Sequence, residues 1–142
     1  MIYDRFQQEA IDYINQGYSV IVCAPTGAGK TAIAEYIINE SIHKNQGVIY
    51  TAPIKALSNQ KFRDFENQFK ENIGILTGDV SLNASAPVLI MTTEIFRNKI
   101  LDESRSSLDE LLELKEGRDE PKSLERYSWV IFDEIHYIDN PE

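Results

Sequence analysis

The segment Ala24-Pro-Thr-Gly-Ala-Gly-Lys-Thr31 determines the architecture expected of this chain. A short apolar run at residues 19–23 precedes it, and a segment with helical spacing at residues 32–38 follows it. A strand, a glycine-rich turn and a helix that begins with Lys-Thr form the context of a phosphate-binding loop. We therefore predict a nucleotide-phosphate site, although the strict pattern has glycine at the position of Ala24. The alternative is a glycine-rich turn followed by a chance Lys-Thr pair.

Each residue of this loop has an expected role. Glycine lets backbone N–H groups converge on phosphate oxygens. The charge of Lys30 would lie on the β- and γ-phosphates, and the Thr31 hydroxyl can complete the shell of a magnesium ion. The remaining residues expected around the phosphates are Thr26, Gly27, Ala28 and Gly29. The predicted ligands are therefore nucleotide phosphates and Mg²⁺, and the resemblance described below implies that the nucleotide is ATP.

Length and composition indicate a single soluble domain. The chain has 142 residues, of which 42% are hydrophobic, and no apolar run approaches membrane-spanning length. The single cysteine, Cys23, lies in the predicted strand and is expected to be a buried apolar side chain, which fits a reducing, cytoplasmic setting. The net charge of −9 argues against a protein that holds nucleic acid by bulk attraction.

Alternating helical and apolar segments predict an α/β fold. We expect a mostly parallel sheet whose strands are buried on both faces. Phenylalanines at helical spacing in the second long helix favour core packing over a base-stacking platform. The predicted helices are residues 4–16, 32–45 (ended by Gly47), a segment from about residue 55 with Leu57, Phe62, Phe65 and Phe69 as core positions, and 93–101 capped by Thr92 or Thr93; the strands are 19–23, 48–52, 73–76, 88–91 and 129–132.

Two acidic residues, Asp133 and Glu134, follow the last apolar strand. Ligands of open α/β sheets bind at the carboxyl ends of the strands, so this pair and the phosphate loop can face one crevice. Asp133 would then hold Mg²⁺, and Glu134 would orient and deprotonate the attacking water. The alternative is a strand that simply ends in two solvated acids.

The segment at residues 102–126 carries nine acidic and five basic residues. Leucines within it predict a short surface helix: Leu108, Leu111, Leu112 and Leu114. A solvated excursion and a partner-docking element are the two interpretations.

Together these residues resemble the DExH-box helicases of superfamily two, in particular the superkiller and exosome-associated RNA helicases. The phosphate loop and Asp133-Glu-Ile-His136 resemble motifs I and II. Three stretches between them resemble motifs Ia, Ib and Ic: Thr51-Ala-Pro-Ile-Lys-Ala-Leu-Ser-Asn-Gln60, Thr77-Gly-Asp79 and Met91-Thr-Thr-Glu-Ile-Phe-Arg97.

The resemblance implies a RecA-like, P-loop NTPase domain and adds further site residues. Gln7 matches the glutamine that contacts adenine, and its amide can offer a donor and an acceptor. His136 would couple the magnesium site to other groups. The positions on motifs that line a single-stranded RNA track are Pro53, Lys55, Thr77, Gly78, Asp79, Thr92 and Thr93. Hydroxyls and helix-start N–H groups there would contact phosphates, which needs few cations.

The resemblance also implies that residues 1–142 are the first RecA-like domain of a longer ATP-dependent RNA helicase, with an acidic insertion at about 102–126. A second RecA-like domain of the same protein would be its partner, and no membrane is expected. Two alternatives remain open. The substrate could be DNA, since backbone contacts discriminate poorly, or the isolated domain could be a nucleotide-binding module without turnover.

Overall fold

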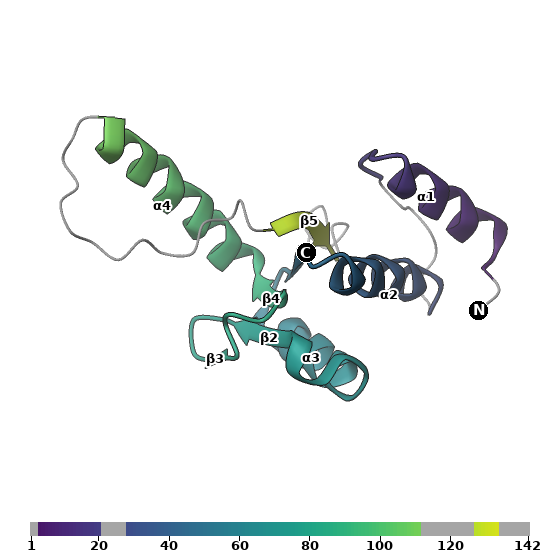
Figure 1. Cartoon of the computed structure of the whole chain (residues 1–142). Coiled ribbons are helices and arrows are strands. Elements are labelled where there is room, and N and C mark those ends of the chain that lie inside the picture. Colours follow the sequence, from purple (N-terminus) through teal and green to yellow (C-terminus); the bar gives the residue numbers. More distant parts are fainter. Residues whose placement is uncertain (1–2, 21–27, 112–126, 134–142) are drawn as a thin grey trace, which may run out of the picture. The chain divides into compact units, whose positions relative to one another are not determined.

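The computed structural model describes residues 3–20, 28–111 and 127–133. These residues fall in two compact units, Met1–Lys44 and Asn45–Glu142. The first unit contains helices α1 (Arg5–Asn15) and α2 (Ala28–His43). The second contains β1 (Gly47–Ala52), α3 (Lys55–Phe69), a 3₁₀ turn (Lys70–Asn72), β2 (Ile73–Leu76), β3 (Ser81–Leu82), β4 (Val88–Thr92), α4 (Thr93–Leu111) and β5 (Tyr127–Phe132) (Figure 1). The predicted strand 19–23 lies mostly outside the described residues.

Helix α1 buries a polar residue that the sequence places among apolar ones. Ala10, Ile11 and Ile14 form its buried face as predicted, but Gln7 is 7% exposed whereas Phe6 is 39% exposed. The Gln7 side chain is held because its Oε1 accepts a hydrogen bond from the backbone N–H of Asp4, the residue before the helix, at 2.7 Å. This bond satisfies a donor that the start of a helix leaves open.

The second helix ends earlier than predicted. α2 ends at His43, whose side chain is exposed, and Asn45 then takes a left-handed conformation with φ 54°. Asparagine tolerates this conformation better than most residues, so it can end a helix as glycine does. Gly47, which the sequence suggested as the stop, is instead the first residue of β1.

The second unit is built on a five-stranded sheet in the order β3-β2-β4-β1-β5. β2, β4, β1 and β5 are parallel, and only the two-residue β3 runs antiparallel, against β2. All residues of β1 and β4 are buried. The structure thus confirms the predicted α/β fold with a mostly parallel sheet. The strand β3 was not predicted, since two exposed residues give no periodic signal.

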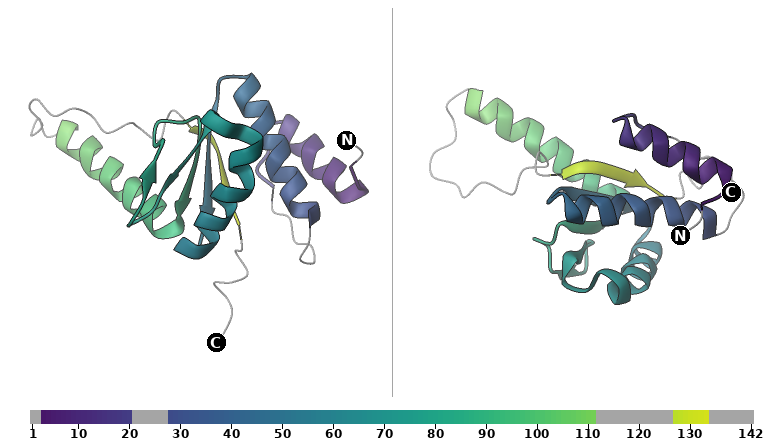
Figure 2. Two further views of the ribbon diagram at one scale, coloured as in Figure 1. Left: turned by 90° about the horizontal axis from the view of Figure 1, so that it is seen from below. Right: turned by 45° about the vertical axis from the view of Figure 1, so that its right-hand side comes forward.

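Alternation along β1 assigns the two helices of this unit to opposite faces of the sheet. The ring of Tyr50 contacts that of Phe65 on α3, with 5.5 Å between ring centroids. The neighbouring residue Ile49 belongs to a cluster with Leu89 and Met91, against which Ile95 and Phe96 of α4 pack. Successive side chains of a strand point to opposite faces, so α3 covers one face and the start of α4 covers the other (Figure 2).

The predictions for β5 and α4 are corrected by the structure. β5 is not buried on both faces, because its residues alternate and Val130 and Phe132 are 38% and 49% exposed. α4 runs to Leu111 and not to Leu101, so the first part of the acidic segment continues this helix. No glycine or proline interrupts residues 93–111, and acidic residues do not by themselves stop a helix. Within the described residues, no helix has the length and apolar character needed to cross a membrane.

Candidate nucleotide and nucleic-acid sites

The first turn of α2 carries the described part of the predicted phosphate loop. Gly29, Lys30 and Thr31 are all half-buried there, and this turn contains no acidic residue. A Cβ atom on Gly29 would lie 2.9 Å from Cζ of Phe6, so glycine allows this close packing. The N–H groups of a first helical turn, with lysine and threonine beside them, can bind phosphate oxygens.

Gln7 joins α1 to this turn. Its Nε2 donates a hydrogen bond to the carbonyl oxygen of Gly29 at 2.9 Å, while its Oε1 accepts from Asp4. The side chain that the sequence assigns to adenine therefore already bonds the loop-bearing helix. Its second amide hydrogen and the second lone pair of its Oε1 are the groups that could meet a base.

Four of the predicted site positions come together at the carboxyl edge of the parallel sheet. Ala52 of β1 lies beside Thr92 of β4, and Leu76 of β2 lies beside Met91. Thr51 lies beside Phe132 of β5, which directly precedes Asp133. The chain therefore leaves each of the four described parallel strands at this edge through a predicted site residue: Pro53, Thr77, Thr93 or Asp133. Ligands of open α/β sheets bind at this edge.

Asp133 is held by three groups, two from β1 and one from α3. Its backbone N–H donates to the carbonyl of Thr51 at 3.0 Å. The Tyr50 hydroxyl donates a short hydrogen bond to Oδ2 of Asp133, and Nζ of Lys61 on α3 lies 3.9 Å from the same oxygen. The Asp133 side chain remains 20% exposed. It is thus a fixed carboxylate with access to solvent, which suits an oxygen ligand for Mg²⁺.

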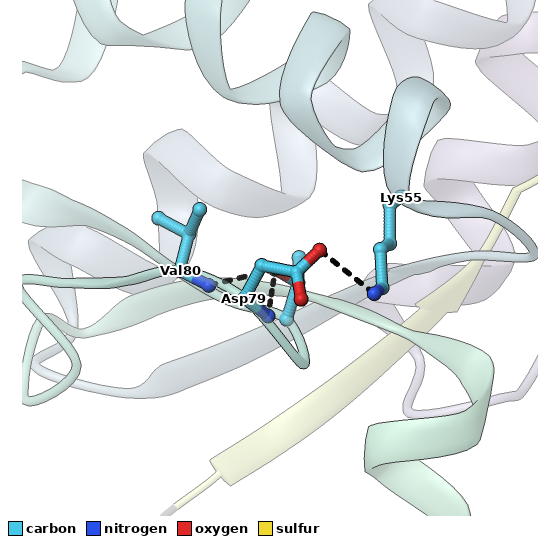
Figure 3. A network of polar contacts seen from close by, with 4 residues as sticks. Lys55, Asp79 and Val80 are labelled. Atoms are coloured by element: carbon cyan, nitrogen blue, oxygen red, sulfur yellow. Dashed lines mark hydrogen bonds and ion pairs between the residues drawn. The ribbon is translucent and has the colours of Figure 1, made fainter.

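The turn after β2 is fixed by a threonine and carries an ion pair. Oγ1 of Thr77 accepts hydrogen bonds from the N–H groups of Asp79 and Val80, at 3.3 and 3.1 Å. Nζ of Lys55 lies 2.8 Å from Oδ2 of Asp79, and a Cβ atom on Gly78 would lie 3.4 Å from that Nζ. Figure 3 shows Lys55 reaching from the start of α3 to Asp79. The turn therefore presents a lysine that is already paired with a carboxylate.

The helix starts at this edge also use their threonines. Oγ1 of Thr92 caps α4 by accepting from the N–H of Ile95 at 3.3 Å, and Thr93 donates to the carbonyl of Ala52 at 3.3 Å. At α3, Pro53 is half-buried, and the residue before the helix, Ile54, provides no side-chain cap. The first N–H groups of α3 are consequently open to a ligand. Thr77 and Thr92 are only 6% and 5% exposed, so these two hydroxyls shape the backbone rather than the surface.

Comparison with known proteins identifies the family. The model of the family described as DEAD/DEAH box helicase matches residues 4–141. The chain belongs to this helicase family. It is 46% identical over 140 residues to the antiviral helicase SKI2 of Saccharomyces cerevisiae, and 49% identical over 139 residues to superkiller complex protein 2 of Mus musculus. It is 43% identical over 141 residues to the exosome RNA helicase MTR4 of Homo sapiens.

These alignments cover 98–99% of this chain but only 10–12% of each relative. The family and the fold expected from the sequence are thus confirmed, together with the similarity to DExH-box RNA helicases. The activity of the whole protein is a matter of proposal.

Several of the predicted site residues lie outside the part of the chain that the structure describes. Thr26, Gly27, Glu134 and His136 are outside it, as is most of the acidic segment from residue 112. The described positions of Lys30 and Thr31 belong to the first compact unit, and Asp133 belongs to the second. Their meeting around one nucleotide stays a prediction.

Two residues of the helicase domain were missed by the sequence interpretation. Tyr50 and Lys61 both contact Asp133, although they are 83 and 72 positions away from it in the chain. One signal was available for Tyr50, since a tyrosine within a buried strand requires a partner for its hydroxyl. Lys61 gave no signal, because a lysine on an amphipathic helix is ordinarily solvated.

Proposed function

We propose that this chain is the ATP-binding, first RecA-like domain of a longer ATP-dependent helicase that moves along single-stranded RNA. The observation that carries the proposal is the shared sheet edge. There the fixed carboxylate of Asp133 lies in the same unit as two helix starts and the turn at Thr77. Membership of the helicase family supports it, as do relatives whose names describe RNA helicases.

The proposed nucleotide site uses residues at the start of α2 and residues that follow β5. Lys30 would bind the β- and γ-phosphates, and the loop from Thr26 to Gly29 would supply N–H groups to them. Thr31 and Asp133 would hold Mg²⁺, which supplies charge neutralisation at the phosphates when it is bound. Both offer hard oxygen ligands: a half-buried hydroxyl and a partly exposed carboxylate. Glu134 accepts a proton from the attacking water, and His136 couples this site to the nucleic-acid track.

In the proposed nucleic-acid track, backbone groups bind and threonines position them. The N–H groups at the start of α3 and the ammonium group of Lys55 would bind phosphate oxygens. Thr77 and Thr92 hold the turn and the start of α4 in shape through the hydrogen bonds described above. This arrangement needs few cations, so it is compatible with a net charge of −9. It reads the phosphate backbone and predicts little preference for sequence.

The test is ATP hydrolysis by the complete natural protein, with and without single-stranded RNA. We expect RNA to raise the rate, and Glu134→Gln to lower it by about 10²- to 10⁴-fold, the usual contribution of a general base. Glu40→Gln makes the same chemical change on the half-buried surface of α2 and should leave the rate unchanged. The proposal is contradicted if RNA does not change the rate of ATP hydrolysis, or if Glu134→Gln does not lower that rate.

Two further measurements address the alternatives. Equal stimulation by matched RNA and DNA strands would broaden the substrate to DNA. The comparison needs strands of one sequence, because only the 2′-hydroxyl then differs. RNA-stimulated hydrolysis by residues 1–142 alone would exclude a module without turnover. We expect that fragment to be slow, because arginine fingers of related P-loop enzymes contribute about 10³- to 10⁵-fold.

A further inference from the structure

Two side chains, Tyr50 and Lys61, converge on Asp133 from the face of the sheet that α3 covers. Tyr50 is 2% exposed and lies on β1, directly beside Ile131 of β5. Asp133 follows Ile131 by two positions, so the two side chains point to the same face as Tyr50. Lys61 reaches the same place from α3. Phe65 of α3 contacts the Tyr50 ring.

The donor in this group is held rigidly. The edge-to-face contact of Tyr50 with Phe65 has ring centroids 5.5 Å apart, and Phe65 in turn contacts Phe69 at 5.7 Å. Both phenylalanines are at most 5% exposed. A buried ring that is packed in a dense core cannot follow a moving partner. The Tyr50 hydroxyl therefore fixes the place where the oxygen of Asp133 must lie.

Both contacts use the same carboxylate oxygen. Oδ2 of Asp133 accepts the bond from Tyr50 and lies 3.9 Å from Nζ of Lys61. Neither contact engages Oδ1. The distance to Lys61 is longer than a hydrogen bond. This side chain therefore acts on Asp133 through its charge and does not fix the orientation of the carboxylate. Its position is also restricted, because Nζ lies 6.0 Å from the centre of the Phe65 ring and the side chain is 22% exposed.

We infer that Tyr50 and Lys61 tune the magnesium affinity of Asp133 in opposite directions. Tyr50 is a positioning residue, which holds Oδ2 so that Oδ1 is presented in one orientation. Partners behind a metal ligand commonly change metal affinity by about 10- to 100-fold when they are lost. Lys61 carries a positive charge. This charge stabilises the Asp133 carboxylate when no Mg²⁺ is bound, and it repels Mg²⁺ when the ion binds to the same carboxylate. This inference rests on the proposed role of Asp133.

The two roles predict opposite changes in magnesium affinity, whereas a purely structural contribution would weaken binding in both variants. A fluorescent ATP analogue is titrated with Mg²⁺ on the complete natural protein, and the Mg²⁺ concentration at half-saturation is measured. Tyr50→Phe keeps the ring contact with Phe65, and we expect it to raise that concentration about 10-fold. Lys61→Gln removes the charge but keeps a polar side chain, and we expect it to lower the concentration about threefold.

Controls separate the possible failures. Tyr36→Phe removes another tyrosine hydroxyl, one that donates to Asn15 on the exposed surface of the first unit, and should leave the magnesium titration unchanged. If the wild-type protein binds the analogue without any magnesium dependence, the proposed function fails. If that dependence is normal and Tyr50→Phe matches the wild type, this inference alone fails. Weaker magnesium binding in both variants would also overturn it. If Tyr50→Phe does not fold, the direction of the change in magnesium affinity of Lys61→Gln still tests the inference.

Discussion

The side-chain amide of Gln7 donates a hydrogen bond to the carbonyl oxygen of Gly29, across 22 positions of the chain. The same side chain accepts from the N–H of Asp4. One buried glutamine thus stabilises the start of α1 and bonds the helix that carries Lys30. An adenine contact through its remaining N–H would link base recognition to the first turn of α2.

The two bonds of Gln7 can be separated by a single substitution. Gln7→Glu retains an acceptor for Asp4 but has no donor for Gly29. We expect it to weaken Mg·ATP binding about 10-fold and to lower the free energy of unfolding by about 1 kcal/mol, the value of one hydrogen bond. Isothermal calorimetry and urea unfolding check the two effects. Gln8→Glu is the control, since it changes the exposed neighbouring side chain on the same helix. Unchanged nucleotide affinity in Gln7→Glu would contradict this role.

The secondary structure could be predicted wherever local pattern determines it. The continuous apolar runs of β1 and β4 give buried strands because both faces of this sheet are covered. Similarly, Pro53 marks the loop before α3, and the spacing of Phe65 and Phe69 puts both in the core. In these cases a short window of sequence is enough to predict the secondary structure and the burial.

The parts that sequence reasoning missed depend on contacts between distant segments. The bond from Tyr50 to Asp133 joins positions 83 apart, and that from Lys55 to Asp79 joins positions 24 apart. No local periodicity records such pairs. The turn at Asn83 is a related case: its left-handed conformation (φ 51°) directs its side-chain amide to the carbonyls of Glu71 and Ile73. The charge and hydropathy of Asn83 alone do not indicate this.

Gly74 on β2 is the glycine with the least room in the described residues. A Cβ atom there would lie 2.0 Å from the backbone oxygen of Asn83. Backbone cannot rotate away, so we expect Gly74→Ala to lower the free energy of unfolding by about 3 kcal/mol or more. Gly17→Ala is the comparison, because nothing lies within 4 Å and only its φ of 89° opposes a side chain. Its expected cost is about 1 kcal/mol. Equal costs in urea unfolding would show that the Asn83 turn moves aside.

Thr92 is expected to act on the nucleic-acid track through the start of α4. Its oxygen caps the helix by accepting from Ile95. Thr92→Val should therefore lower the free energy of unfolding by about 1 kcal/mol, and fraying of the first turn should weaken RNA binding. Thr92→Ser retains the cap and should restore both, as measured by thermal unfolding and fluorescence anisotropy. If the serine variant regains stability but not RNA affinity, the methyl group of Thr92 matters instead, and the capping explanation is wrong.

The ion pair of Lys55 with Asp79 is expected to restrain RNA binding. Both side chains are more than half exposed, at 51% and 71%, so the pair is weak and a phosphate can replace the carboxylate. Asp79→Asn frees Lys55 and should tighten binding of single-stranded RNA several-fold at low salt. The slope of log affinity against log salt should steepen by about 0.7, the value for one more phosphate contact. Asp64→Asn, an exposed acid on α3, is the control for the change in net charge. Weaker binding in Asp79→Asn, equal to that in Lys55→Ala, would instead mean that Asp79 holds Lys55 in its binding position.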